Sequence, residues 1–291
     1  MCARGRAPGG RSLTQPDGSE FDAIAAEYDR VRPSYPAALV EAACDRARLV
    51  PGNRVLEIGC GTGKLTEMLV ARGLHVDAVD PGQRLVDEAR RRVGDTDVCF
   101  HLGRFEELEL PPASFAAAFS GTAFHWIDPA VGWGKVAKLL APGGVLALLQ
   151  AGLPALVREF DRSVWESVLP GEAWPATDPF DVWREAAARR DDVSALWSWL
   201  VRHDLHHAEA VDCFHDAQLL TVPVPVEDTA DSYLELIATT STYLRLEPDQ
   251  RAVLDRSVRE LFRTAGGSNR WVDYATLVTA RRRRGRTRSR R

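Results

Sequence analysis

Three glycines alternate with other residues at Gly59, Gly61 and Gly63, directly after an apolar run that ends at Ile58. Glycine tolerates positive φ and lets the backbone approach a ligand closely, so this loop can cradle a small molecule. A dinucleotide fold would need a glycine at the sixth position of G-x-G-x-x-G, where Lys64 stands. A phosphate loop would need a glycine at Ile58. The register therefore argues against both phosphate-binding motifs.

An acidic residue lies on each side of this loop. Glu57 precedes the glycines, and Asp80 closes the next apolar run, Val-Asp-Ala-Val-Asp. With these acids, the segment E-x-G-x-G-x-G resembles the class I S-adenosylmethionine-dependent methyltransferases. The resemblance implies S-adenosylmethionine as cofactor and S-adenosylhomocysteine as product. That ligand has a cationic amino group and a sulfonium but no phosphate, so carboxylates beside the loop suit it.

The resemblance also assigns cofactor-binding roles. It puts Glu57 and the loop at the methionine end and Asp80 at the ribose hydroxyls, although Asp80 could instead be the N-cap of a helix over 82–93. Arg104 stands where related proteins often carry an acid that binds adenine. This leaves adenine to the main chain and ring of Phe105, or leaves Phe105 to the core. The predicted set is Tyr28, Glu57, Gly59, Cys60, Gly61, Gly63, Asp80, Pro81, Arg104, Phe105 and Ser120.

Two further segments, YDRVRPSYP at 28–36 and SGTAFHW at 120–126, resemble the small-molecule branch that includes trans-aconitate methyltransferase-like proteins. The resemblance covers residues 21–150. It implies that Tyr28 belongs to a lid over the cofactor; the alternative is a surface helix that packs its aromatic ring.

Methyl transfer requires chiefly that the acceptor be aligned and desolvated, and a general base only where the acceptor is protonated. His125, after the fourth predicted strand, is the candidate base because histidine titrates near neutrality; a structural histidine between aromatic neighbours is the alternative. Trp126, Trp199 and Tyr243 are candidate acceptor contacts, on the hypothesis that a tryptophan-rich stretch roofs an apolar pocket. These side chains could equally form the core of that stretch.

The hydrophobic periodicity predicts the elements that position these residues. Apolar runs alternate with amphipathic stretches, which predicts strands at 54–58, 75–79, 98–102, 114–119 and 145–150 and helices at 62–72, 82–93 and 129–140. Further on, the pattern predicts a strand at 214–222, helices at 226–244 and 248–265, and a strand at 271–280. The predicted fold class is α/β, a Rossmann-like seven-stranded mostly parallel sheet with helices on both faces and helical cap insertions. Ligands are expected beyond the carboxyl ends of the strands.

The same pattern predicts the domain organisation. The methyltransferase core is expected at 21–150 and 205–280, with a helical cap insertion at 151–204. The helices within 226–265 are also expected near the site. Residues 1–20 and the basic segment 281–291 are expected to be disordered tails.

Charge and composition narrow the partners. The net charge is −4, and the last eleven residues contain eight arginines and no acid, so the rest of the chain carries −12. An acidic body makes nucleic acid an unlikely partner, and the tail is expected to be solvated. Five scattered cysteines and an H-x-x-H-H segment without a glutamate predict no metal site. No apolar run approaches about 18 residues and no signal peptide is recognisable, so a soluble cytoplasmic protein without membrane contact is expected.

The sequence thus predicts methyl transfer to a small-molecule acceptor, at oxygen, carbon or a carboxylate. Two alternatives stay open: a nucleic-acid or protein methyltransferase that uses the arginine-rich tail, and a non-catalytic binding module. Neither the acceptor nor the oligomeric state follows from the residues.

Overall fold

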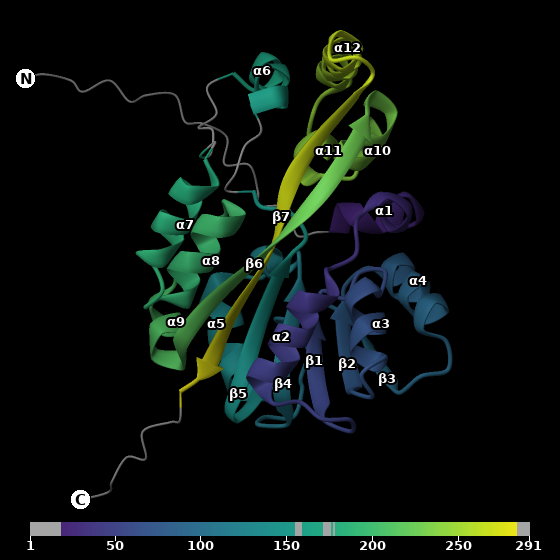
Figure 1. Cartoon of the computed structure of the whole chain (residues 1–291). Coiled ribbons are helices and arrows are strands. Elements are labelled where there is room, and N and C mark those ends of the chain that lie inside the picture. The colour runs from purple at the N-terminus through teal and green to yellow at the C-terminus, as the bar shows by residue number, and fades with distance from the viewer. Residues whose placement is uncertain (1–18, 155–158, 171–175, 177, 284–291) are drawn as a thin grey trace, which may run out of the picture.

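The computed structural model describes residues 19–154, 159–170, 176 and 178–283. Its centre is a seven-stranded sheet of order β3-β2-β1-β4-β5-β7-β6 (Figure 1). The strands are β1 (Arg54–Ile58), β2 (His75–Asp80), β3 (Val98–Leu102), β4 (Phe115–Gly121), β5 (Leu140–Gln150), β6 (Phe214–Thr229) and β7 (Ser268–Arg282). Only β7 runs against its neighbours, β5 and β6. The predicted Rossmann-like, mostly parallel fold is confirmed.

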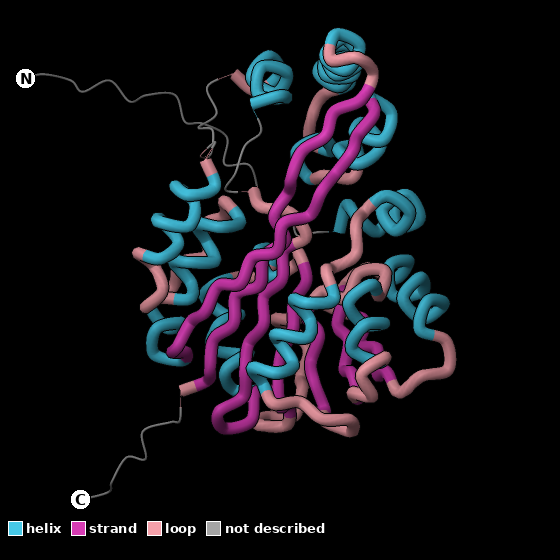
Figure 2. The backbone as a smooth tube through the Cα atoms, viewed as in Figure 1, coloured by secondary structure: helices cyan, strands magenta, loops and turns pink. Residues whose placement is uncertain are grey.

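Helices cover both faces of the sheet. One face carries α2 (Ala37–Ala47), α3 (Lys64–Val70) and α4 (Gln83–Val93), and the other carries α5 (Pro129–Leu139), α7 (Pro179–Ala187), α8 (Val193–Val201) and α9 (Ala208–Cys213) (Figures 1 and 2). Along β1, Val55 packs into the hydrophobic core under α2, α3 and α4. Leu56 and Ile58 pack into the core on the opposite face of the sheet. A strand buried on both faces must be apolar at almost every position, which explains the unbroken runs in the sequence.

The last two strands extend far beyond the sheet. β5 pairs only with residues 276–281 of β7, so the rest of the β6–β7 hairpin projects past the carboxyl ends of the parallel strands (Figure 2). Helices α6 (Glu159–Val168), α10 (Ala230–Ala238), α11 (Ser241–Leu244) and α12 (Pro248–Thr264) surround this projection. Leu254, Val258 and Phe262 of α12 pack there against Tyr233 and Ile237 of α10 in a separate small core.

Several predicted boundaries differ from the structure. Residues 226–229 continue β6 rather than starting a helix. The strand runs through Pro223 and Pro225, which is tolerated because β6 is an edge strand and needs no N–H on its outer side. Arg281 and Arg282 are the last residues of β7, so the predicted tail begins too early. At the other end, a 3-10 helix, η1, already starts at Ser19 (Ser19–Ile24).

The predicted cap insertion divides into two parts. α6 contacts α12 in the projecting subdomain, whereas α7 and α8 bury Val182, Leu196 and Trp197 in the main core of the sheet. Helix α8 begins where the Asp192 carboxylate accepts hydrogen bonds from the Ser194 and Ala195 amides. The first part of the insertion thus packs on the projecting subdomain, and the second packs on the sheet. Among the helices that the structure describes, none is both long and apolar enough to cross a membrane.

Candidate functional site

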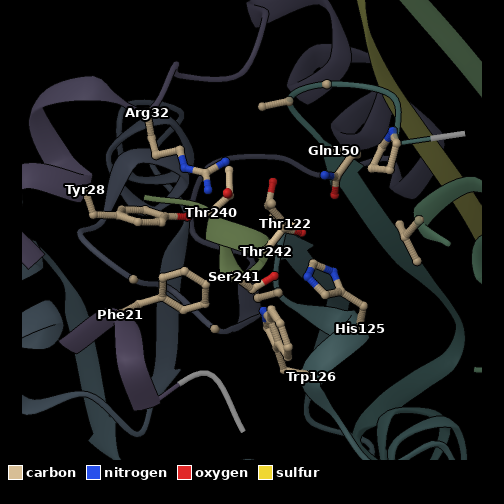
Figure 3. Close-up of a pocket in the computed structure, with 18 of the residues that line it drawn as sticks. Phe21, Tyr28, Arg32, Thr122, His125, Trp126, Gln150, Thr240, Ser241 and Thr242 are labelled. Atoms are coloured by element: carbon tan, nitrogen blue, oxygen red, sulfur yellow. The ribbon is translucent and has the colours of Figure 1, made fainter. Parts of the chain in front are cut away.

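A cavity of about 1210 Å³ lies at the carboxyl ends of the parallel strands. Helices η1 and α1 (Ala25–Val31) and the projecting subdomain both line it, and Figure 3 shows Thr240 of that subdomain beside Tyr28 and Arg32. Most predicted site residues line it: Tyr28, Glu57, Gly59, Cys60, Gly61, Asp80, Pro81, Arg104, Phe105, His125 and Trp126. The strand-end position expected for ligands in this topology therefore coincides with the predicted residues.

The glycine loop presents bare backbone to this cavity. Gly59 has φ +71°, and a Cβ there would come within 2.3 Å of the Ala123 Cβ. Gly61 has φ +52°, and a Cβ would meet nothing within 4 Å. Gly63 differs, because a Cβ there would come within 2.9 Å of the Ala89 Cα in α4 and the residue does not line the cavity. Gly61 thus leaves open space at the cavity, Gly59 allows the loop to approach Ala123, and Gly63 allows α3 to pack against α4.

Glu57 is a buried carboxyl at the end of β1. It is 1% exposed, and its Oε2 has no hydrogen-bond partner among the residues that the structure describes. Burial raises its pKa to about 8; the Thr66 hydroxyl opposes this shift and the Asp80 charge adds to it. An unpaired buried carboxyl is stabilised by a cation that donates a hydrogen bond, so a ligand amino group would satisfy Glu57.

Asp80 is held by backbone amides rather than by a helix end. Its two oxygens accept hydrogen bonds from the amides of Gly61 at 2.9 Å and Gly82 at 2.8 Å. Burial raises its pKa to about 6, and both amides oppose that shift. The first amides of α4, those of Arg84 and Leu85, bind the Asp22 carboxylate at 2.7 and 3.2 Å. The cap of α4 is therefore Asp22 from η1, which leaves Asp80 at the cavity wall.

The N-terminal helices form a cover that is fastened on both sides. Arg92 of α4 binds the Asp29 carboxylate at 2.5 Å, and Arg32 binds Thr239, just beyond α10, through its Nε at 2.9 Å. Within this cover, the Tyr28 ring packs against the Phe21 ring with 5.6 Å between the ring centroids, and burial raises the pKa of Tyr28. The cover therefore joins the sheet domain to the projecting subdomain over the cavity.

The predicted adenine end is mixed in character. Phe105 is a core residue that also reaches the cavity, and the Lys135 ammonium lies 5.1 Å from its ring centroid. Arg104 lines the cavity beside it and forms an ion pair with Glu106 at 3.4 Å. Both predicted roles of Phe105 are thus compatible with its position.

His125 lies at the cavity in a 3-10 helix, η2 (Phe124–Trp126), with 7% of its surface exposed. Its ring centroid is 4.7 Å from that of Trp126 and 4.7 Å from that of His203. Burial lowers the pKa of His125 to about 3, and the charges of His203 and Arg32 add to the shift. The imidazole is therefore neutral at pH 7 but a weak base.

Besides Gly63, three predicted contacts lie outside the cavity lining. Ser120 is fully buried and donates a hydrogen bond to the Ile58 carbonyl at 2.7 Å, which ties β4 to β1. Trp199 packs on the main core under the Arg189 guanidinium. Tyr243 packs on the small core, and its hydroxyl donates to Asp255 at 3.2 Å. The structure thus gives these three side chains packing partners instead of access to a ligand.

The sequence analysis missed a group of polar residues on the β4 and β5 side of the cavity. They come from strand ends, from the end of α8 and from the loop around α11, and they are Thr122, Gln150, His203, Thr240, Ser241, Thr242 and Arg245. Figure 3 shows Thr122, Gln150 and His125 pointing toward the same space. These polar groups lie beside apolar lining residues, among them Leu153, Trp165 and Trp271, so this half of the cavity is mixed in character rather than the apolar pocket that the tryptophan-rich stretch suggested.

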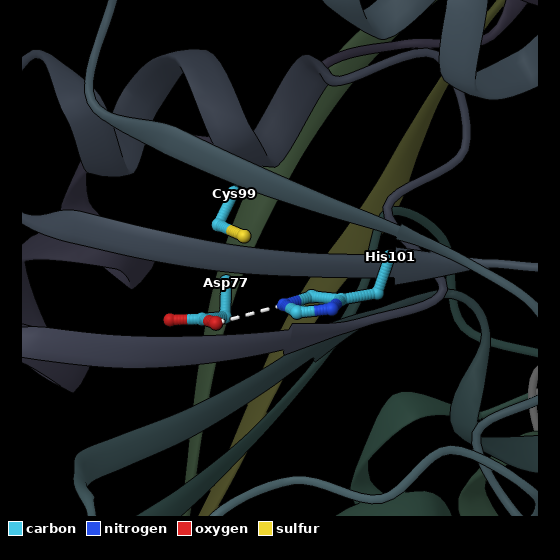
Figure 4. A group of neighbouring side chains, drawn as sticks. All are labelled: Asp77, Cys99 and His101. Atoms are coloured by element: carbon cyan, nitrogen blue, oxygen red, sulfur yellow. Dashed lines mark hydrogen bonds and ion pairs between the residues drawn. The ribbon is translucent and has the colours of Figure 1, made fainter.

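One cluster with metal-ligand chemistry lies on the surface of the sheet, away from the cavity. Ligand atoms of Asp77, Cys99 and His101 lie within 4.8 Å of one another, on β2 and β3 (Figure 4). The Arg54 guanidinium already binds both Asp77 oxygens, at 2.7 and 2.8 Å, and His101 Nε2 lies 2.8 Å from one of them. A metal ion would have to displace this guanidinium, so the cluster is best explained as a polar connection across β1, β2 and β3.

Comparison with known proteins agrees with this fold. Residues 55–144 match the model of a family described as a methyltransferase domain. A Mycobacterium tuberculosis protein named as an uncharacterized methyltransferase is 41% identical over 129 residues, which are 44% of this chain and 51% of that protein. The chain thus spans about half the length of the curated relatives it matches.

Two solved structures show the same architecture. Haemonchus contortus phosphoethanolamine N-methyltransferase 2, solved with phosphomonomethylethanolamine and S-adenosylhomocysteine, aligns with a TM-score of 0.51 and 16% identity, over 92% of this chain and 58% of that one. The 4+2 cyclase SpnF aligns with a TM-score of 0.52 and 17% identity, over 93% and 97%. At these identities the likeness concerns the fold alone. Residues 55–144 therefore match a methyltransferase domain family, and the chain shares the fold of these two solved structures.

Proposed function

We propose that this protein transfers a methyl group from S-adenosylmethionine to a small-molecule acceptor. The observation that carries the proposal is the buried Glu57 carboxyl, whose Oε2 has no hydrogen-bond partner among the described residues, in the same cavity as the open backbone of Gly61. A ligand ammonium group would favour the ionised form of this carboxyl and be stabilised by it, whereas a phosphate would be repelled by that ionised form.

The residues present fit that ligand. Glu57 would bind the amino group, and Asp80 would face the ribose hydroxyls. The backbone at Gly59 and Gly61 would lie against the methionine portion. Phe105, with Pro81 and Arg104, would bound the adenine. When bound, S-adenosylmethionine supplies a methyl group whose bond to sulfur breaks with both electrons retained by sulfur, while a lone pair of the acceptor forms the new bond to carbon.

The remaining tasks belong to the walls of the cavity. The cover over Tyr28 would exclude water, and the polar group around Thr122 would align the acceptor. His125 is proposed as the group that takes the acceptor's proton, if the acceptor carries one. Because burial lowers its pKa to about 3, the bound acceptor must raise that pKa before proton transfer is efficient.

A small acceptor suits the geometry better than a nucleic acid. β7 pairs Thr276 with Gln150 at the cavity and Arg281 with Val145 toward the opposite end of the sheet. At about 3.4 Å per residue, Arg283 lies roughly 24 Å from Thr276 along the direction of the strand. The arginine-rich segment thus begins at the far end of the sheet from the cavity.

Calorimetry with S-adenosylmethionine and S-adenosylhomocysteine tests the proposal. Gly61→Ala and Gly94→Ala form a matched pair, because both glycines have positive φ and space for a Cβ, but only Gly61 lines the cavity. We expect both variants to lose similar stability and only Gly61→Ala to lose affinity. Absence of binding to the wild type at millimolar ligand would refute the proposal.

Binding alone does not establish transfer, because a protein named as a cyclase shares this fold. A screen of alcohols, phenols, carboxylic acids and amines with labelled methyl donor is therefore the second step. Binding without transfer to any of these classes would favour a binding module over a methyltransferase.

A further inference from the structure

A second buried polar side chain faces the cavity, on the side away from the glycine loop. We propose that Gln150 positions the methyl acceptor by accepting a hydrogen bond from an O–H or N–H group of that molecule. The inference rests on the proposed function and specifies the chemistry of its second substrate.

The Gln150 side chain is buried and has an unused acceptor atom. Gln150 is the last residue of β5, is 9% exposed and lines the cavity. Its Oε1 has no hydrogen-bond partner among the residues that the structure describes. In Figure 3 the amide points into the space bounded by Thr122 and His125. A donor that reaches Oε1 can therefore come from a ligand in the cavity.

The local sequence indicates that folding alone does not favour an amide side chain at position 150. The five residues before it, Val145 to Leu149, are all apolar and buried, as expected for a central parallel strand. A leucine of similar size would continue that pattern without burying an unpaired oxygen. Unpaired buried polar atoms in folded proteins often mark functional sites, where a ligand completes the hydrogen bond. A polar residue that ends an apolar strand at a cavity fits this description.

The position of Gln150 separates it from the proposed cofactor. Glu57 in β1 pairs with Phe119 in β4, which pairs with Ala147 in β5, so Gln150 lies two strands across and three residues further along. With about 4.8 Å between strands and 3.3 Å per residue, the two Cα atoms are about 14 Å apart. Glu57 also lies on the α3 face of the sheet, whereas Leu146 and Leu148, in phase with Gln150, face the other core. The ligand of Gln150 is therefore the acceptor rather than the methionine end of the cofactor.

The neighbours of Gln150 narrow the chemistry. The Thr122 hydroxyl shares a hydrogen bond with the Tyr35 hydroxyl at 3.0 Å, and the His125 ring packs against the rings of Trp126 and His203. Among the described residues, neither group donates to the Gln150 amide oxygen. An acceptor with a hydroxyl or amine beside its reacting atom would do so, and a site built around such a bond discriminates strongly against an analogue that lacks it.

Three variants test this role. Gln150→Leu removes the amide at similar size, and Gln150→Glu keeps an oxygen that can accept the hydrogen bond. Thr276→Val is the matched control, because Thr276 pairs with Gln150 in the sheet, is fully buried with an unpartnered Oγ1 among the described residues, and does not line the cavity. Each variant is compared with the wild type in melting temperature, S-adenosylmethionine affinity and methyl transfer.

The transfer assay uses labelled S-adenosylmethionine and three probe pairs: catechol with phenol, salicylate with benzoate, and malate with succinate. Both members of a pair offer an oxygen to methylate, and only the first has a neighbouring hydroxyl. We expect the wild type to prefer the first member of at least one pair, and Gln150→Leu to lower kcat/KM for that member about 10- to 100-fold. Gln150→Glu should recover part of the loss, and Thr276→Val should behave as wild type.

The other readouts separate this proposal from the proposed function. Gln150→Leu should bind S-adenosylmethionine within about twofold of wild type and melt at or above the wild-type temperature. Failure of the wild type to bind S-adenosylmethionine would refute the proposed function, and this inference with it. If the wild type binds S-adenosylmethionine, three results would overturn the inference alone. These are an unchanged kcat/KM in Gln150→Leu, no preference of the wild type within any probe pair, and no transfer by the wild type to any probe. A melting temperature of Gln150→Leu several degrees below wild type would also overturn it, because the amide would then contribute to folding.

Discussion

Replacing Glu57 by glutamine should stabilise the ligand-free protein while weakening cofactor binding. The pKa of Glu57 is raised from 4.5 to about 8 by burial, so at pH 7 the folded chain holds a proton that the unfolded chain has released. A group whose folded pKa is raised contributes stability that is complete below its unfolded pKa and is lost as the pH rises through the folded pKa. At about 1.4 kcal/mol per pH unit, the loss between pH 4.5 and pH 7 is about 3 kcal/mol.

Glutamine has a similar shape and does not ionise, so Glu57→Gln should avoid this loss. The gain at pH 7 corresponds to roughly 6 to 12 °C in melting temperature. It should disappear near pH 4.5 and be largest above pH 8. S-adenosylmethionine should bind about 10- to 100-fold more weakly, because a hydrogen bond to a charged group is lost.

Scanning calorimetry at pH 4.5, 7 and 8.5, together with titration calorimetry, measures both effects. Titration of the wild type at pH 7 in buffers of different ionisation enthalpy should also show release of about one proton per ligand bound, because the ammonium group ionises Glu57. A Glu57→Gln protein that is less stable at pH 7 and binds the ligand normally would refute this reasoning.

Three further outcomes are expected. Asp22→Ala removes the cap of α4 and should lower the free energy of unfolding by about 1 kcal/mol, with faster amide exchange at Arg84 and Leu85; unchanged exchange there would contradict the assigned cap. Because burial lowers the pKa of His125 to about 3, titration of His125 should not affect kcat/KM between pH 5 and 8, and the pH profiles of wild type and His125→Ala should have the same shape. A change of kcat/KM near pH 6.5 that is present in the wild type and absent in His125→Ala would show that the site raises this pKa. Removing residues 284–291 should leave S-adenosylmethionine affinity unchanged and reduce only salt-sensitive retention on DNA; a loss of ligand affinity would place the tail at the cavity.

The sheet and the glycine loop could be predicted because both depend on local sequence. The alternation of apolar runs identified the parallel strands, and Glu57, Gly59, Gly61 and Asp80 indicated the end of the sheet at which the cavity lies. Position in the strand alone brings these residues together, since carboxyl ends of parallel strands meet at one edge.

The acceptor side could not be predicted in the same way. Trp199 and Tyr243 were chosen for residue type, but helix packing turns them toward hydrophobic cores. His203 and Arg245 come from segments far apart in the sequence that the tertiary fold brings to the same cavity. Gln150 was also missed, although a polar residue at the end of five apolar ones was visible in the sequence.

The two unpaired side chains, Glu57 and Gln150, lead to a last prediction about their independence. They lie about 14 Å apart by strand spacing and belong to opposite faces of the sheet, so they share no hydrogen-bond partner. Stability changes at sites more than about 10 Å apart usually add within about 0.5 kcal/mol. The double variant Glu57→Gln, Gln150→Leu should therefore be stabilised by the sum of the two single changes, measured by denaturant unfolding at pH 7. A double variant no more stable than the better single one would indicate one polar network across β4, and a single ligand would then suffice to satisfy both atoms. Additivity would instead mean that Glu57 and Gln150 each lower the stability of the protein independently, as expected for a site that binds two different molecules.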